Sequence, residues 1–144
     1  MVIQRWQSLF LFIAVVLMGI FCVSTLATIT SPTGAYPEVA FQAYDEWGYF
    51  LLNIVTTILV LLSIFLFKQT SVQRTIVLVS MLLMVISAVC GLWIFFDLMG
   101  QNQGETVKLS LSGILLCCSF VLCLLAYIFI SKDEKLLRSY DRIR

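Results

Sequence analysis

The sequence predicts an all-α integral membrane protein in which four transmembrane helices form one bundle. Hydrophobic residues make up 61% of its 144 residues and charged residues only 12%, whereas soluble domains average about 25% charged residues. Four stretches contain no charged side chain at all: residues 6–37, 47–67, 75–96 and 109–131. Each is long enough to cross a hydrocarbon core of about 30 Å as a helix of about 20 residues.

Residues 1–144 are therefore expected to form a single transmembrane domain, with spans at about 6–29, 48–67, 75–96 and 109–130 and a tail at 131–144. Eight of the nine basic residues lie before the first span, between the second and third spans, or after the fourth, which is one side of the membrane. Only Lys108, between the third and fourth spans, lies on the other side. Basic residues in short loops are retained in the cytoplasm during insertion. The sequence thus predicts a multi-pass membrane protein with both termini cytoplasmic and two external loops.

The first span is expected to run to about Thr28, because Pro32 and Pro37 oppose further helix. A cleaved signal peptide is the alternative, since Arg5 precedes an apolar run that ends in small residues. The first external loop and the start of the next span carry five aromatic residues: Tyr36, Phe41, Tyr44, Trp47 and Tyr49. Aromatic rings gather at membrane interfaces, so this loop is expected to lie on the membrane surface, with a ligand-binding lid as the alternative.

The second span contains Asn53, an amide side chain deep within an apolar stretch, with Thr56 and Thr57 nearby. An unsatisfied polar group costs several kcal/mol in hydrocarbon, so these side chains need partners. Hydrogen bonding to a neighbouring helix is the favoured interpretation, and contact with a substrate is the alternative. Asn53, Thr56 and Thr57 are therefore the candidate polar contacts inside the membrane.

The inner loop from Lys68 to Arg74 is short enough to make the second and third spans an antiparallel hairpin. Small residues stand one helical turn apart in the third and fourth spans: Ser87 and Gly91, Gly113 and Cys117, and Ser119 and Cys123. Small residues at this spacing let helix backbones approach closely. We expect these faces to pack within the bundle or along a homodimer contact.

The sequence gives little support to catalysis, to a metal site or to a bound cofactor. It contains no histidine, the commonest general base and transition-metal ligand, and its apolar stretches hold no carboxylate. The five cysteines all lie in those stretches without a Cys-x-x-Cys motif, so they are expected to be small packing residues, not disulfides. An enzyme is not expected, and neither sign of charge dominates enough to suggest nucleic acid.

The tail combines charge pairs with an apolar stripe. Glu134 and Arg138 stand four residues apart, and Arg138 with Asp141 stands three apart, as in a helix with weak ion pairs. Leu136, Tyr140 and Ile143 would fall along one side. The tail is therefore expected to be an amphipathic helix that can rest on a membrane or on another protein.

Three segments also carry a family resemblance: Ile3-Gln4-Arg5, the inner loop ending in Gln73-Arg74, and the tail from Asp133 to Arg144. Together they resemble the Bacteroidota four-span family of unknown function, domain of unknown function 4293. The resemblance runs over the full length, and the tail is its most specific part. It implies four helices in the inner membrane and supplies no activity or catalytic residue.

The resemblance directs attention to the cytoplasmic side, where a candidate docking face would comprise Gln4, Arg5, Gln73, Arg74, Asp133, Glu134, Arg138, Ser139, Asp141 and Arg142. The function expected is a membrane scaffold or accessory subunit that docks a protein partner there. Binding of anionic lipid, or a role only in setting topology, would use the same residues. The alternative is a subunit of a small transporter or channel formed by oligomerisation, with Asn53, Thr56 and Thr57 along its pathway.

Overall fold

The computed structural model describes residues 2–30, 39–66, 69–101 and 106–141, with the side chains of 2–6, 135 and 137–141 excepted. The described chain is mostly helical. Its helices are α1 (Val2–Cys22), α2 (Trp47–Phe65), α3 (Thr70–Gln101) and α4 (Ser112–Asp141), and its strands are β1 (Thr25–Thr30), β2 (Val39–Gln42) and β3 (Thr106–Leu109).

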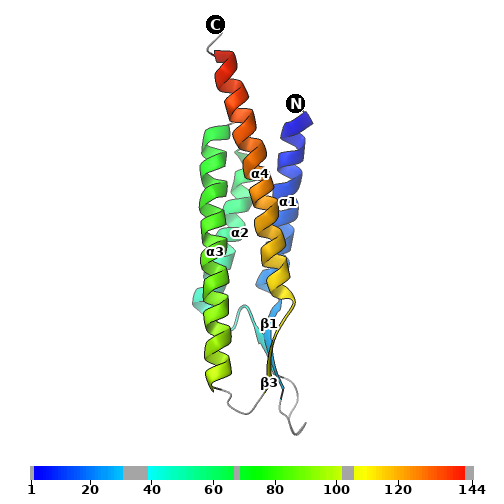
Figure 1. Cartoon of the computed structure of the whole chain (residues 1–144), viewed down its shortest axis with the longest axis vertical. Helices are drawn as coiled ribbons and strands as arrows, with labels where there is room; N and C mark the ends of the chain where they lie inside the picture. The colour runs from blue at the N-terminus through cyan, green and yellow to red at the C-terminus, as the bar shows by residue number, and fades with distance from the viewer. Residues whose placement is uncertain (1, 31–38, 67–68, 102–105, 142–144) are drawn as a thin grey trace.

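The four helices run side by side, with the strands gathered beyond one end of them (Figure 1). Helix α1 packs against α2 and α4, and α3 packs against the same two helices from the other side. The start of α1 and the end of α4 lie together at the end opposite the strands. We call these two ends of the molecule the terminal end and the sheet end.

Each helix presents a narrow buried seam in which residues recur at alternating steps of four and three. The seams comprise Gln7, Leu11, Ala14, Met18 and Phe21 in α1; Tyr49, Asn53, Thr56, Val60 and Ser63 in α2; Gln73, Val77, Ser80, Met84 and Ser87 in α3; and Leu116, Ser119, Cys123, Ala126 and Ile130 in α4. This repeat keeps one seam facing the neighbouring helices along the whole length, as in coiled coils.

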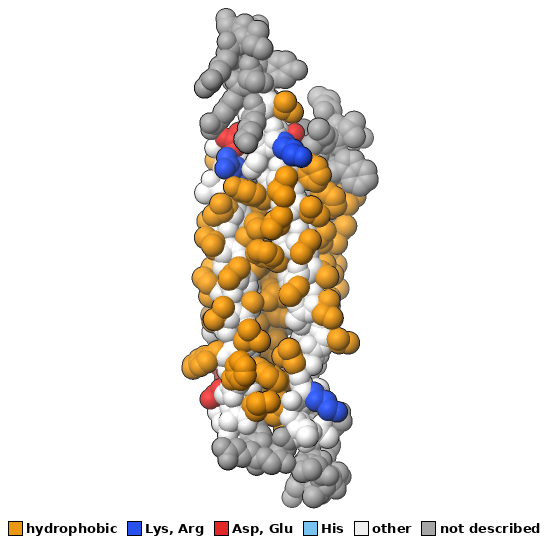
Figure 2. All heavy atoms as spheres, in the orientation of Figure 1, with side chains coloured by type: hydrophobic (Ala, Val, Ile, Leu, Met, Phe, Trp, Pro, Cys, Tyr) orange, Lys and Arg blue, Asp and Glu red, His pale blue; other side chains and the backbone are white. Residues whose placement is uncertain are grey.

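The outward faces of the helices are as apolar as the interior. Hydrophobic side chains cover the middle of the visible face, and charged side chains lie only near its two ends (Figure 2). Three helices, α2, α3 and α4, are long and apolar enough to cross a membrane. In α1 the apolar stretch that is described, Gln7–Cys22, is shorter. This composition is compatible with a membrane location.

The strands form an antiparallel sheet in the order β2-β1-β3, so β1 is central and joins the two loops of the sheet end. Thr28 faces Ala40 on β2 and Lys108 on β3. The sequence of β1, Thr-Leu-Ala-Thr-Ile-Thr, is rich in β-branched residues, which favour extended backbone.

This sheet corrects the all-helical prediction. The first span was expected to be helical to about Thr28 within residues 6–29, but α1 ends at Cys22 and the next segment pairs with two other strands. Cross-strand hydrogen bonds and β-branched side chains thus outweigh the apolar character that suggested more helix. Helix boundaries differ elsewhere too: α3 already begins at Thr70 and continues past Phe96 to Gln101.

Candidate functional site

The terminal end contains a polar network that joins α3 to α4. The Arg74 guanidinium donates to the Glu134 carboxylate at 3.1 Å and to the Tyr127 hydroxyl at 3.2 and 3.3 Å. Its Cζ also lies 5.4 Å from the centroid of the Tyr127 ring, where a cation is attracted by the ring. The Glu134 side chain is 9% exposed and that of Arg74 is 43% exposed. The network therefore has a buried carboxylate and an accessible guanidinium.

A second contact at the same level joins α4 to α1. Gln7, which is buried, donates from its amide nitrogen to the Asp133 carboxylate. The rings of Phe10 and Phe129 stack nearby, with centroids 5.9 Å apart. Because Asp133 and Glu134 are adjacent in sequence, one turn of α4 is tied to both α1 and α3. We call the five residues Gln7, Arg74, Tyr127, Asp133 and Glu134 the terminal clamp.

Above the terminal clamp, α4 continues as a single helix to Asp141 and extends past the ends of the other three helices (Figure 1). Leu136, on this extension, is exposed. The clamp therefore fixes the direction of a helix that projects from the body of the molecule.

The residues of the candidate docking face are placed differently from one another. Gln73 is 2% exposed and faces the interior, so a partner cannot reach it. Arg74, Asp133 and Glu134 belong to the terminal clamp. Arg142 lies outside the described residues, as do the side chains of Gln4, Arg5, Arg138, Ser139 and Asp141.

Two members of the clamp, Gln7 and Tyr127, were missed by sequence reasoning. A weak signal for Tyr127 exists, because it stands seven residues before Glu134 and so shares its side of the helix. Gln7 is the first amide within the charge-free stretch. Neither position indicates which helix would supply its partner, because that depends on the packing order of the four helices.

The polar side chains within α2 are satisfied inside the protein. Ser87 of α3 donates to the Asn53 side-chain oxygen at 2.7 Å, and Asn53 donates to the Tyr49 carbonyl at 2.8 Å. Thr56 and Thr57 donate to the carbonyls four residues earlier in their own helix. Asn53 therefore links α2 to α3. Thr57 also contacts the Cys22 thiol of α1, with 3.9 Å between Oγ1 and Sγ, whereas the hydrogen bond of Thr56 stays within α2.

Titratable side chains do not gather into a metal-binding group in the part of the chain that the structure describes, where no three His, Cys, Asp or Glu residues come together. The cysteines are all free thiols. Cys22 and Cys123 are buried as expected of packing residues, but Cys117 and Cys118, both on α4, are exposed.

An apolar cavity of about 540 Å³ lies at the other end of the molecule, between α3, α4 and the sheet. Sequence reasoning missed it, since it depends on a sheet that was not foreseen. The only trace in the sequence is the accumulation of small residues at the facing ends of two helices, including Ala88, Gly91 and Gly113.

Comparison with known proteins identifies the family of the chain but no activity. The family model described as domain of unknown function DUF4293 matches residues 3–143. No curated protein matches the sequence. Since the match covers nearly the whole chain, the protein belongs to the DUF4293 family.

Proposed function

We propose that the protein is a four-helix transmembrane bundle of the bacterial inner membrane that acts as a scaffold or accessory subunit. Both termini lie in the cytoplasm in this proposal, because the basic residues concentrate at the terminal end and such residues are retained there. The three long apolar helices and the apolar outer faces support the membrane location. The cytoplasmic face is where a protein partner docks.

The observation that carries this proposal is the projecting part of α4, held at its base by the terminal clamp. Isolated helices shorter than about 12–15 residues are marginal in water. A projecting helix with an apolar stripe gains stability when another protein covers that stripe. The clamp fixes the direction of this extension, on which Leu136 is exposed, and this favours a specific partner over loose adhesion to the membrane.

The interior gives less support to a transporter or channel subunit. Asn53, Thr56 and Thr57 direct their hydrogen bonds to protein atoms, so they offer no free groups to a solute. Nearer the terminal end, the α2 and α3 seams present Val60 and Val77, which are fully buried. We therefore place the activity of the protein in contacts made at its surface.

The docking proposal is tested by replacing Arg138, Asp141 and Arg142 together with alanine and crosslinking proteins in native membranes. A matched control removes three charges at the sheet end, with Glu46, Asp97 and Lys108 replaced by alanine. We expect the tail variant to insert normally and to lose about tenfold or more of one crosslinked partner, because contact residues at an interface centre carry most of its energy. Equal recovery from both variants would refute docking through the tail.

The role of the clamp in setting direction has its own test. One alanine inserted between Lys135 and Leu136 rotates the rest of the tail by about 100°, whereas a seven-residue helical insertion nearly restores its direction. We expect the first insertion to abolish crosslinking and the second to retain it. If both insertions behave alike, the tail binds without a fixed orientation.

A further inference from the structure

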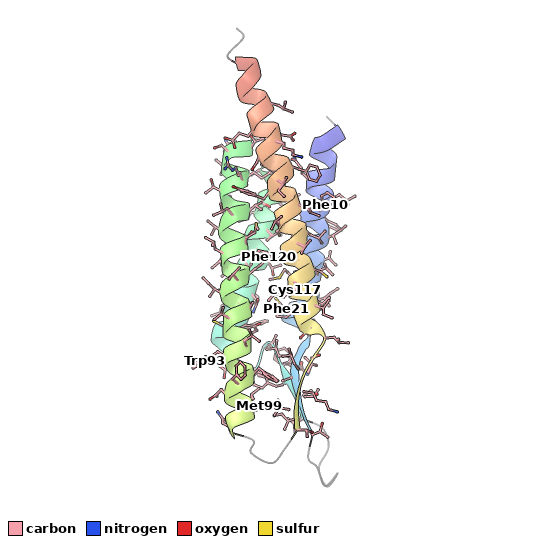
Figure 3. The ribbon with its side chains drawn as sticks, viewed as in Figure 1. Phe10, Phe21, Trp93, Met99, Cys117 and Phe120 are labelled. Atoms are coloured by element: carbon pink, nitrogen blue, oxygen red, sulfur yellow. The ribbon has the colours of Figure 1, made fainter. Side chains whose placement is uncertain are left out.

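The apolar cavity at the sheet end is enclosed on its inner side by buried residues from four elements. Phe21 of α1, Ala27 of β1, Tyr49 of α2 and Leu116 of α4 form this inner wall. Phe21 and Cys117 mark its level in Figure 3, where the helices meet the sheet. No carboxylate, ammonium or guanidinium group belongs to the lining that the structure describes.

The cavity exists because α3 and α4 carry small residues where they face each other near the sheet. Ala88 and Gly91 line it from α3, and Ser112, Gly113 and Cys117 line it from α4. A Cβ atom added at Gly113 would meet nothing within 4 Å. These residues leave open a space that larger side chains would fill, since protein interiors otherwise contain few voids larger than a water molecule.

The mouth of the cavity opens sideways between the two helices. Its rim is formed by exposed apolar side chains, namely Leu92 of α3, Ile114 of α4, and Leu111, which directly precedes α4 and is 78% exposed. Leu92 and Ile114 belong to candidate membrane spans. In a membrane, the mouth would face lipid hydrocarbon and not water.

We propose that this cavity is a binding site for one acyl chain of a membrane phospholipid, which enters sideways between α3 and α4. Its volume lies within the range of about 300–1,000 Å³ that is typical of ligand sites. Water gains little in a space with so few polar partners, and an unfilled apolar space loses packing contacts along its walls. A hydrocarbon chain satisfies both conditions, and the surrounding bilayer supplies it.

A neighbouring hollow explains why a charged head is not the group that is recognised. That hollow, about 570 Å³, lies on the α2 side of α3 and includes Glu46 and Asp97 in its lining. It shares Tyr49, Ile94 and Leu98 with the apolar cavity. Its carboxylates would repel the phosphate and attract the ammonium group of a phosphatidylethanolamine head, and these effects oppose each other, so recognition of the phospholipid depends on the buried acyl chain.

The proposal rests on the membrane embedding proposed above, but not on docking at the terminal end. The protein is reconstituted in phosphatidylethanolamine vesicles containing a phosphatidylethanolamine with a photoreactive diazirine in its acyl chain. After illumination, we expect adducts to concentrate on the residues that line the cavity, with Phe95 and the buried Leu116 prominent. Adducts distributed over all four helices in proportion to their exposure would overturn the site while preserving the embedding. An absence of adducts would contradict the embedding itself.

A variant in which a larger side chain fills the cavity is compared with a variant that carries the same side chain elsewhere. Gly113→Leu places a side chain into the space, and Gly19→Leu adds the same side chain on α1, where an added Cβ also meets nothing within 4 Å. We expect Gly113→Leu to lower the cavity adducts about tenfold, because it displaces buried hydrocarbon, and Gly19→Leu to leave them unchanged. Ala88→Leu serves as a second filling variant if Gly113→Leu does not fold.

Native mass spectrometry of the purified protein then identifies the occupant. We expect one retained phospholipid in the unaltered protein and in Gly19→Leu, and none in the filled variants. Retention of an isoprenoid quinone, or equal retention of phospholipid in all variants, would overturn the assignment.

Discussion

The contact between α3 and the Tyr49 side chain of α2 depends on the missing side chain of Gly91. A Cβ atom at this position would lie 2.9 Å from the Tyr49 hydroxyl oxygen, closer than normal van der Waals contact. The Tyr49 ring is buried and packs edge-on against Phe21, with ring centroids 6.4 Å apart, so moving its hydroxyl away would disturb this ring contact. One turn away, Ser87 and Asn53 are hydrogen-bonded across the same two helices.

We therefore expect Gly91→Ala to destabilise the protein by about 1–3 kcal/mol, as added atoms do in a well-packed interior. Tyr49→Phe removes the clashing oxygen and leaves ring carbon Cζ at 3.5 Å, an ordinary contact. In that background the cost of Gly91→Ala should disappear. The measurement is reversible unfolding in mixed micelles of mild and denaturing detergent.

Gly19→Ala is the control for this prediction, because its added Cβ meets nothing within 4 Å. It should stabilise α1 by about 0.5–1 kcal/mol through the lower backbone entropy of alanine. An equal effect of the Gly91 change in both Tyr49 backgrounds would show that the hydroxyl does not limit the approach.

At the residue scale, the spacing of small residues predicts which face of a helix can pack closely. It does not predict which neighbouring helix packs there. Ser87 with Gly91 contacts α2, although Gly91 also borders the cavity, whereas Gly113 with Cys117, at the same spacing, lines the open cavity. Both pairs satisfy the same pattern. The difference comes from the separation of the helices at that level, which the spacing of residues on one helix does not contain.

Among the elements, the helices were largely predictable and the sheet was not. The charge-free stretches located α2, α3 and α4, since an apolar run of this length has few alternatives to a helix. Strand β1 gains its hydrogen bonds from β2 and β3, and β3 is remote in sequence. Because such partners are non-local, the β-branched run Thr25–Thr30 alone could not decide between the end of a helix and a strand.

The pairing of β1 with β3 can be tested with an engineered disulfide. Thr28 and Lys108 face each other across the two antiparallel strands, and facing residues have Cα atoms about 4.5–5.5 Å apart, within the range that a disulfide accepts. We expect Thr28→Cys with Lys108→Cys to crosslink under mild oxidation, as seen by altered mobility on non-reducing gels.

The control for this disulfide shifts one cysteine by a single residue. In Thr28→Cys with Val107→Cys the second side chain points to the other face of the sheet, so crosslinking should be much weaker. Equally efficient crosslinking in both pairs would mean that the register of β1 and β3 is not fixed.

At the scale of the whole molecule, the arrangement of charge and the packing of the helices are mutually consistent. Glu134 and Arg74 from distant parts of the sequence meet at the terminal end, which the basic-residue distribution assigns to one side of the membrane. Lys108 lies on β3 at the opposite end. The four membrane crossings proposed above require this division, because an even number of crossings returns the chain to the side from which it started.

The proposed orientation therefore predicts which positions of the chain lie in the cytoplasm and which are accessible from the periplasm. A fluorescent protein that matures only in the cytoplasm should become fluorescent when fused before Met1 and also when fused after Arg144.

A cysteine replacing Lys108, which is exposed, should react in intact cells with a maleimide that enters the periplasm but not the cytoplasm. Cys117 and Cys118, although exposed on α4, should stay unlabelled because a polar maleimide does not enter the hydrocarbon of the membrane. Fluorescence from only one fusion would mean an odd number of crossings. Protection of the Lys108 position, with both fusions fluorescent, would place the sheet on the cytoplasmic side or within the membrane, and would remove the basis for assigning the terminal end to a cytoplasmic partner.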